Sequence, residues 1–133
     1  MSRAITDLVA LLGGMEPVLN PGEWAYSLLP EGAPVPKDAI GWFREREGLT
    51  VIGPADGVAE PLFRCAWITL RVQSALEAVG LTAAVSAALT EAGISCNVVA
   101  AAHHDHLFVP FERAEDALAC LQALQRASLG ETG

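Results

Sequence analysis

The chain has 133 residues, of which 52% are hydrophobic and 18% are charged, so it is expected to fold around one core or two small packed ones. The net charge is −8 and the eight Lys and Arg residues are scattered, which argues against a nucleic-acid interface. No segment has the roughly 18 continuous apolar residues of a membrane span, and three cysteines without close spacing fit a reducing compartment, so we expect a cytoplasmic protein that contacts neither membrane nor nucleic acid.

The first half of the chain is predicted to contain a helix, two strands, a second helix and a third strand. Apolar residues at helical spacing after a Ser2 cap predict an amphipathic helix and not a signal peptide. The motif "NPG" predicts a turn between two strands, and "KDAIGWFRERE" predicts a short helix that Gly41 weakens. The five elements cover residues 2–12, 15–20, 23–29, 37–47 and 48–54, and a linker is expected over 55–61.

The second half is predicted to contain a strand, a helix, two strands and a final helix. Ala66, Ile68, Leu70 and Val72 alternate onto one face of the first strand. The stretch "LTAAVSAALTEAG" carries an apolar stripe at helical spacing, with Thr82 as its expected cap. These elements cover residues 65–72, 81–93, 94–101, 106–111 and 112–127.

The element order predicts an α+β fold built from two similar halves. Each half is one strand short of a βαββαβ unit, and each is about half of the chain. We therefore predict two ferredoxin-like units packed in tandem, over residues 1–60 and 61–133. A swapped or shared strand would complete each unit.

A family resemblance covers nearly the whole chain. The stretch "SALEAVGLTAAV", followed by "CNVVA" and "HDHLFVP", closely resembles the C-terminal part of a bacterial family of small tandem ACT-domain proteins. The segments "PGEWAYSLLP" and "AIGWFREREGLTVI" resemble the N-terminal part of the same family. The resemblance implies a regulatory protein that senses a free amino acid at the interface between ACT units, without catalytic activity or a cofactor.

The resemblance also implies which residues contact the effector. They come from the loop and helix start after the first strand of the second unit, from the neighbouring strand and from the histidine-rich hairpin. The residues are Ser74, Gly80, Leu81, Thr82, Cys96, Asn97, Val98, His104, Asp105 and His106.

Physical chemistry agrees with part of this assignment. A helix start at Leu81 would offer unpaired N–H groups to a carboxylate, Gly80 would permit close approach, and Asp105 could pair with an ammonium group. Each residue also has a structural explanation. Gly80 fits a turn, Thr82 a cap, Ser74 a bond within its own loop and Cys96 a small buried hydrophobe.

The stretch "AAHHDHLFVP" raises the question of a metal site, because it holds all three histidines of the chain. On a strand, His104 and His106 share one face, while His103 and Asp105 share the other. No set of metal ligands converges locally, so we expect no bound metal. A Cys96 nucleophile with a histidine base is the catalytic alternative, and it has no motif to support it.

Two other hypotheses stay open from the sequence alone. One is a protein–protein interaction module with a degenerate pocket, and the other is a small metal or thiol enzyme. A homodimer is the expected assembly, because isologous pairing is the commonest oligomeric arrangement.

Overall fold

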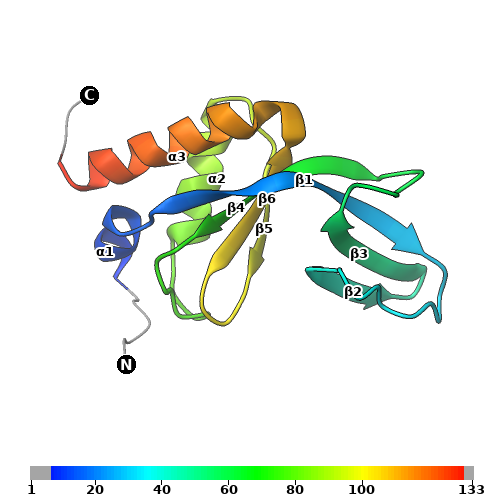
Figure 1. Cartoon of the computed structure of the whole chain (residues 1–133). Helices are drawn as coiled ribbons and strands as arrows, with labels where there is room; N and C mark the ends of the chain where they lie inside the picture. The colour runs from blue at the N-terminus through cyan, green and yellow to red at the C-terminus, as the bar shows by residue number, and fades with distance from the viewer. Residues whose placement is uncertain (1–6, 131–133) are drawn as a thin grey trace.

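A computed structural model describes residues 7–130 of the chain, and it arranges six strands in one antiparallel sheet of order β2-β3-β1-β4-β6-β5 (Figure 1). The predicted Ser2 cap lies outside the described residues. The elements are α1 (Leu8–Gly13), β1 (Pro17–Leu29), β2 (Gly41–Glu45), β3 (Gly48–Pro54), β4 (Phe63–Leu70), α2 (Leu81–Glu91), β5 (Asn97–Ala100), β6 (Asp105–Pro110), a 3₁₀ turn (Phe111–Arg113) and α3 (Ala114–Ser128).

Strand β1 belongs to both halves of the sheet. It pairs with β4 on one side and, from Trp24 onward, with β3 on the other. The prediction of two strands around a turn at "NPG" is wrong, because this motif forms a bulge in one continuous strand between Asn20 and Trp24. Gly22 has a φ of 99°, which suits a bulge better than a regular strand. Residues on both sides of the bulge pair with β4.

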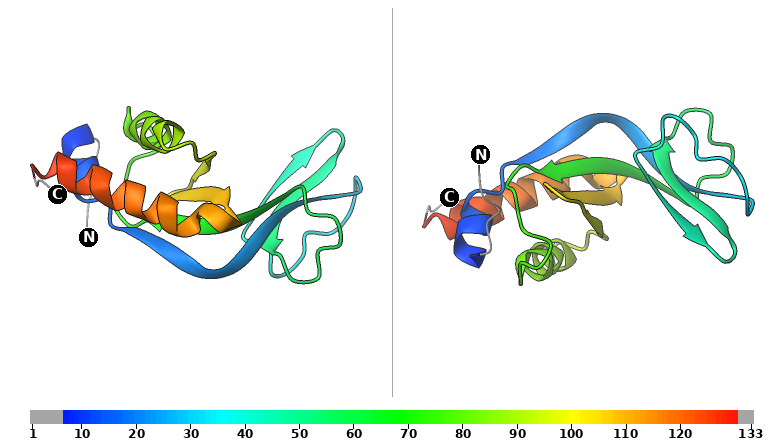
Figure 2. Two further views of the ribbon diagram at one scale, coloured as in Figure 1. Left: turned by 90° about the horizontal axis from the view of Figure 1, so that it is seen from above. Right: turned by 90° about the horizontal axis from the view of Figure 1, so that it is seen from below.

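The second half has the predicted order β4-α2-β5-β6-α3, and β1 takes the place of the strand that this half lacks. The predicted α+β class, with helices against an antiparallel sheet, is confirmed. Figure 2 shows α2 and α3 beside the part of the sheet that β4, β5 and β6 form, with the β2–β3 hairpin at the far end of the molecule.

The main core lies between the helices and one face of the sheet. The predicted inward face of β4 is confirmed, since Ala66, Ile68 and Leu70 are fully buried there. The helices contribute Leu11, Leu81, Val85, Leu89, Ala117 and Leu121, and β6 contributes Leu107 and Val109. We call the opposite side the helix-free face. It carries Trp67, Thr69, His106 and Phe108.

The predicted helix over residues 37–47 is wrong. Residues Gly41–Glu45 form β2, which pairs with β3 in a hairpin. Gly41 disfavours a helix, and the adjacent Trp42 and Phe43 favour a strand once β3 supplies a partner. The expected linker is also tied to the sheet, because the Ala55 and Leu62 amides donate to carbonyl oxygens of β1 at 2.9 and 2.8 Å.

Candidate functional site

The start of α2 is a helix end without a side-chain cap. The helix begins at Leu81, so the capping position belongs to Gly80, whose φ is 104°, and no side chain among residues 7–130 caps the first N–H groups. Thr82 was predicted as the cap, but it lies within the first turn. The opening N–H groups of α2 are therefore available to an acceptor, and the partial positive charge of the helix end favours an anion.

Gly80 has a structural reason to be glycine. Its positive φ is disfavoured for other residues, and a Cβ atom there would lie 3.1 Å from the Leu8 side chain of α1. Substitution at this position would strain the backbone as well as alter any pocket. Gly80 variants would therefore change the backbone together with any ligand contact. A substitution at Asp105 tests a ligand contact more directly.

Asp105 is a buried carboxyl group at the start of β6, with only 6% of its surface exposed. It sits in register between Leu70 of β4 and Ala100 of β5. The Ser74 hydroxyl donates to its Oδ2 atom over a long 3.5 Å, and no Lys or Arg among residues 7–130 forms a salt bridge with it. Burial raises the pKa of the Asp105 carboxyl above its ordinary value.

Asp105 and the start of α2 line one small cavity of about 70 Å³. The structure brings five of the predicted site residues together there: Ser74, Gly80, Leu81, Thr82 and Asp105. A buried acid thus lies across a small space from an uncapped helix start. This arrangement can hold an ammonium group and a carboxylate of the same small molecule.

Three predicted residues on the neighbouring strand do not reach this cavity. Ala100 lines it, but Asn97 lies three residues earlier on β5, about 10 Å along the strand. Asn97 is exposed, whereas Cys96 and Val98 pack against the main core. Burial raises the pKa of the Cys96 thiol to about 11, so the thiolate that a cysteine nucleophile requires is scarce at neutral pH.

His104 and His106 also lie away from the cavity, on the opposite side of the sheet from Asp105. The predicted alternation of His106 and Asp105 along the strand is confirmed, because His106 bonds to Trp67 on the helix-free face. The Trp67 Nε1–H donates to His106 Nδ1 at 3.0 Å. Among residues 7–130, no three His, Cys, Asp or Glu side chains gather closely enough to hold a metal ion.

Two family models match the chain in tandem, and both describe ACT domains. One matches residues 3–60 and the other residues 62–123. The chain belongs to the ACT-domain family. The predicted tandem of ACT-type units is therefore confirmed, and ACT domains are regulatory modules, not catalytic ones.

Solved structures of other proteins share the ACT fold of this chain. A protein of unknown function from Vibrio cholerae, described as a possible transport protein, is 40% identical, with a TM-score of 0.75 over 89% of this chain and 95% of that one. The ligand-free regulatory subunit of aspartate kinase from Thermus thermophilus is 11% identical, with a TM-score of 0.59 over 84% of this chain and 97% of that one. The regulatory subunit from Thermus flavus is 13% identical, with a TM-score of 0.59 over 81% and 95%.

No curated protein shows significant similarity to this chain. Within residues 7–130, no helix has the length and apolar character needed to cross a membrane.

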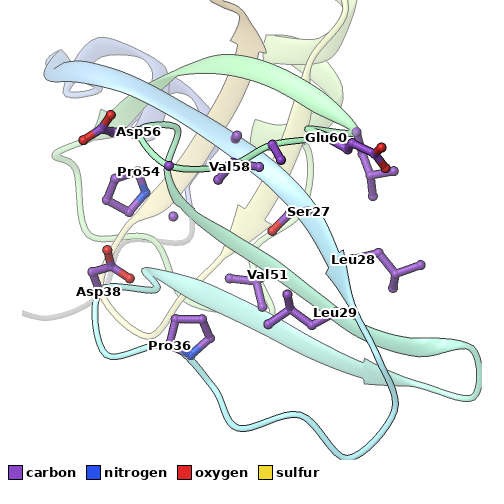
Figure 3. A pocket seen from close by; sticks show the side chains of 15 residues that line it. Ser27, Leu28, Leu29, Pro36, Asp38, Val51, Pro54, Asp56, Val58 and Glu60 are labelled. Atoms are coloured by element: carbon purple, nitrogen blue, oxygen red, sulfur yellow. The ribbon is translucent and has the colours of Figure 1, made fainter.

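A larger cavity in the first ACT match was not foreseen from the sequence. It measures about 590 Å³ and lies between β1, β3 and the loop over residues 55–62. Figure 3 shows Asp38 and Asp56 toward one end of it and Glu60 toward the other. No motif signals this cavity, because it depends on how the predicted linker folds back against β1.

Proposed function

We propose that the protein is a regulatory module that binds a free amino acid between Asp105 and the start of α2. The observation that carries the proposal is a buried carboxyl group that lacks a cationic partner in the described chain and faces an uncapped helix end. The α-ammonium group of the effector pairs with Asp105, and its carboxylate accepts from the first N–H groups of α2. We also propose that the two ACT units of the chain span residues 1–60 and 61–133.

A second copy of the chain completes the site in this proposal. The cavity of about 70 Å³ is well below the roughly 300 Å³ at which ligand pockets begin. Next to it, Leu76 and Val79 expose 71% and 82% of their surfaces, and the nearby strand β5 is an edge of the sheet. A homodimer that covers these side chains would enlarge and close the pocket.

Light scattering tests the assembly. We expect the wild-type protein to have about twice the 13.9 kDa mass of one chain at micromolar concentration. Val79→Asp should shift it toward the monomer, because it places a charge in the apolar contact. Leu62→Asp is the matched control, since Leu62 is 64% exposed in the loop before β4 and lies beside β1 and β3, outside the proposed contact. A wild type that stays monomeric at every concentration contradicts the dimer.

A thermal-shift screen of the common amino acids tests the function. Binding to the folded state alone stabilises it by about 2.7 kcal/mol at a hundredfold excess over Kd. Each kcal/mol raises the midpoint by roughly 2–8 °C for a domain of this size. We expect one clear responder at millimolar concentration. If no amino acid or related small acid shifts the midpoint, the effector proposal fails.

One surface feature favours the second candidate function, a module for protein contacts. Trp42 and Phe43 expose 50% and 70% of their surfaces on β2, which is the other edge of the sheet. Exposed aromatic side chains on an edge strand favour pairing with another chain. This function predicts a partner and no amino-acid response in the thermal screen.

We also propose that the protein acts in the cytoplasm, and the free state of all three cysteines supports this location.

A further inference from the structure

The helix-free face contains a groove made of two adjoining hollows. The first, of about 330 Å³, is lined by Ile52, Trp67, Val99, His106 and Phe108, among others. The second, of about 260 Å³, is lined by Val18, Asn20, Thr69, Arg71 and His104. The Thr69 hydroxyl and His106 Nδ1 lie 3.1 Å apart, which joins the two hollows. We call the pair the sheet groove.

One end of the sheet groove is apolar and aromatic. The rings of Trp67 and Phe108 lie 6.5 Å apart with an interplanar angle of 20°. Val99 of the edge strand β5 is 41% exposed beside them, and Ile52 of the hairpin closes the other side. Such walls favour a flat apolar group, which gains by leaving water.

A hydrogen-bond network fixes the middle of the groove. The Asn20 side-chain amide donates to the Trp67 carbonyl oxygen at 3.1 Å and to Thr69 Oγ1 at 2.9 Å. His106 Nδ1 accepts from the Trp67 indole, and burial lowers the pKa of His106, which favours the neutral ring at neutral pH. The proton of that ring then lies on Nε2.

The other end of the groove carries Arg71 and His104, which form no salt bridge with an acid among residues 7–130. Arg71 is exposed, and its guanidinium forms no salt bridge with any acid among residues 7–130, although the chain carries a net charge of −8. His104 Nδ1 is buried and has no hydrogen-bond partner in the described part of the chain. A carboxylate in this hollow would pair with the Arg71 guanidinium and lie beside the His104 side chain, which lines the same hollow.

We propose that the sheet groove binds a small monocarboxylate with a flat apolar body. The carboxylate lies against Arg71 and His104, and the ring lies against Trp67 and Phe108. Thr69, which lines the second hollow together with Arg71 and His104, is two residues from Trp67 on β4, about 7 Å. A carboxylate and a phenyl ring joined by three methylene groups can match this spacing. This site is separate from the effector cavity, because Asp105 lies on the other side of the sheet.

Isothermal titration of the full chain with 4-phenylbutanoate tests the proposal. We expect saturable binding, and binding about tenfold or more weaker for the neutral 4-phenylbutanamide, because the amide loses the charge-assisted bonds. Butanoate, which lacks the ring, should bind more weakly still than 4-phenylbutanoate. Arg71→Gln should weaken the acid by a similar factor and leave the amide unchanged. Val99→Glu should remove binding of both, by placing a charge at the apolar end.

Two results separate this site from the effector site. Asp105→Asn should leave the affinity for 4-phenylbutanoate unchanged, and excess amino acid should not compete with it. Loss of acid binding in Asp105→Asn would place the acid in the effector cavity and overturn the proposal. The proposal is also overturned if the wild type does not bind 4-phenylbutanoate at millimolar concentration. It is overturned as well if the wild type, Arg71→Gln and Val99→Glu bind this acid with equal affinity. If a second copy fills the groove, Val99→Glu alters light scattering and no acid binds, which also overturns it.

Discussion

Asp105→Asn is expected to abolish the rise in melting temperature that the effector produces, while the ligand-free variant melts at the same temperature as the wild type or higher. Asparagine keeps the shape of the side chain but cannot pair with an ammonium group by charge. The lost response corresponds to about 2.7 kcal/mol at a hundredfold excess of effector over its wild-type Kd. Thermal shift with and without the responding amino acid measures both effects.

The pH dependence gives the same variant a second readout. Burial raises the pKa of Asp105 in the folded state, so its contribution to stability is present at low pH and is lost as pH rises through that pKa. Asp105→Asn should lack this loss. Effector binding has the opposite dependence, because the ammonium group pairs with the ionised carboxylate. Affinity should therefore rise as the pH rises toward the raised pKa of Asp105 and level off above it. An undiminished effector response in Asp105→Asn would refute the assigned contact.

Leu107→Ala is expected to destabilise the protein by about 2–5 kcal/mol. Leu107 of β6 is fully buried in the main core between the sheet and the helices, so its removal leaves a cavity as well as losing apolar burial. Chemical denaturation with urea measures the change as a lower midpoint at an unchanged slope.

A matched leucine provides the control. Leu62 is 64% exposed in the loop before β4, and Leu62→Ala should change stability by no more than about 0.5 kcal/mol. Equal effects of the two substitutions would mean that Leu107 does not occupy the core that the structure assigns to it.

The second half of the fold could be predicted because its local patterns and its packing agree. The apolar stripe of residues 81–93 faces the sheet as a helix, and Ile68 and Leu70 face inward as their alternation predicts. In the first half, local signals and packing disagree. The "NPG" motif has turn chemistry, but β4 holds both of its flanks in one strand. Pairing partners of this kind lie far away in the sequence and leave no local mark.

The candidate site was predictable to a similar extent. The loop at Ser74 and the start of α2 come together with Asp105 because consecutive elements of this unit meet at one end of the sheet. Asn97 was assigned to the same site, although alternation along β5 places Asn97 and Val98 on opposite faces. The sheet groove was beyond prediction, because it depends on how the β2–β3 hairpin, with Ile52, lies over the helix-free face.

Strand β1, which both halves share, has a consequence for how the chain folds during synthesis. Residues 17–26 leave the ribosome early, but their partners on β4, residues 63–70, are made only after the whole first half. Closing this long loop costs entropy before the pairing rewards it, and such distant contacts slow folding. The edge of β1 that pairs with β4 therefore stays unpaired until β4 has been synthesised. The two ACT units cannot fold independently, one after the other.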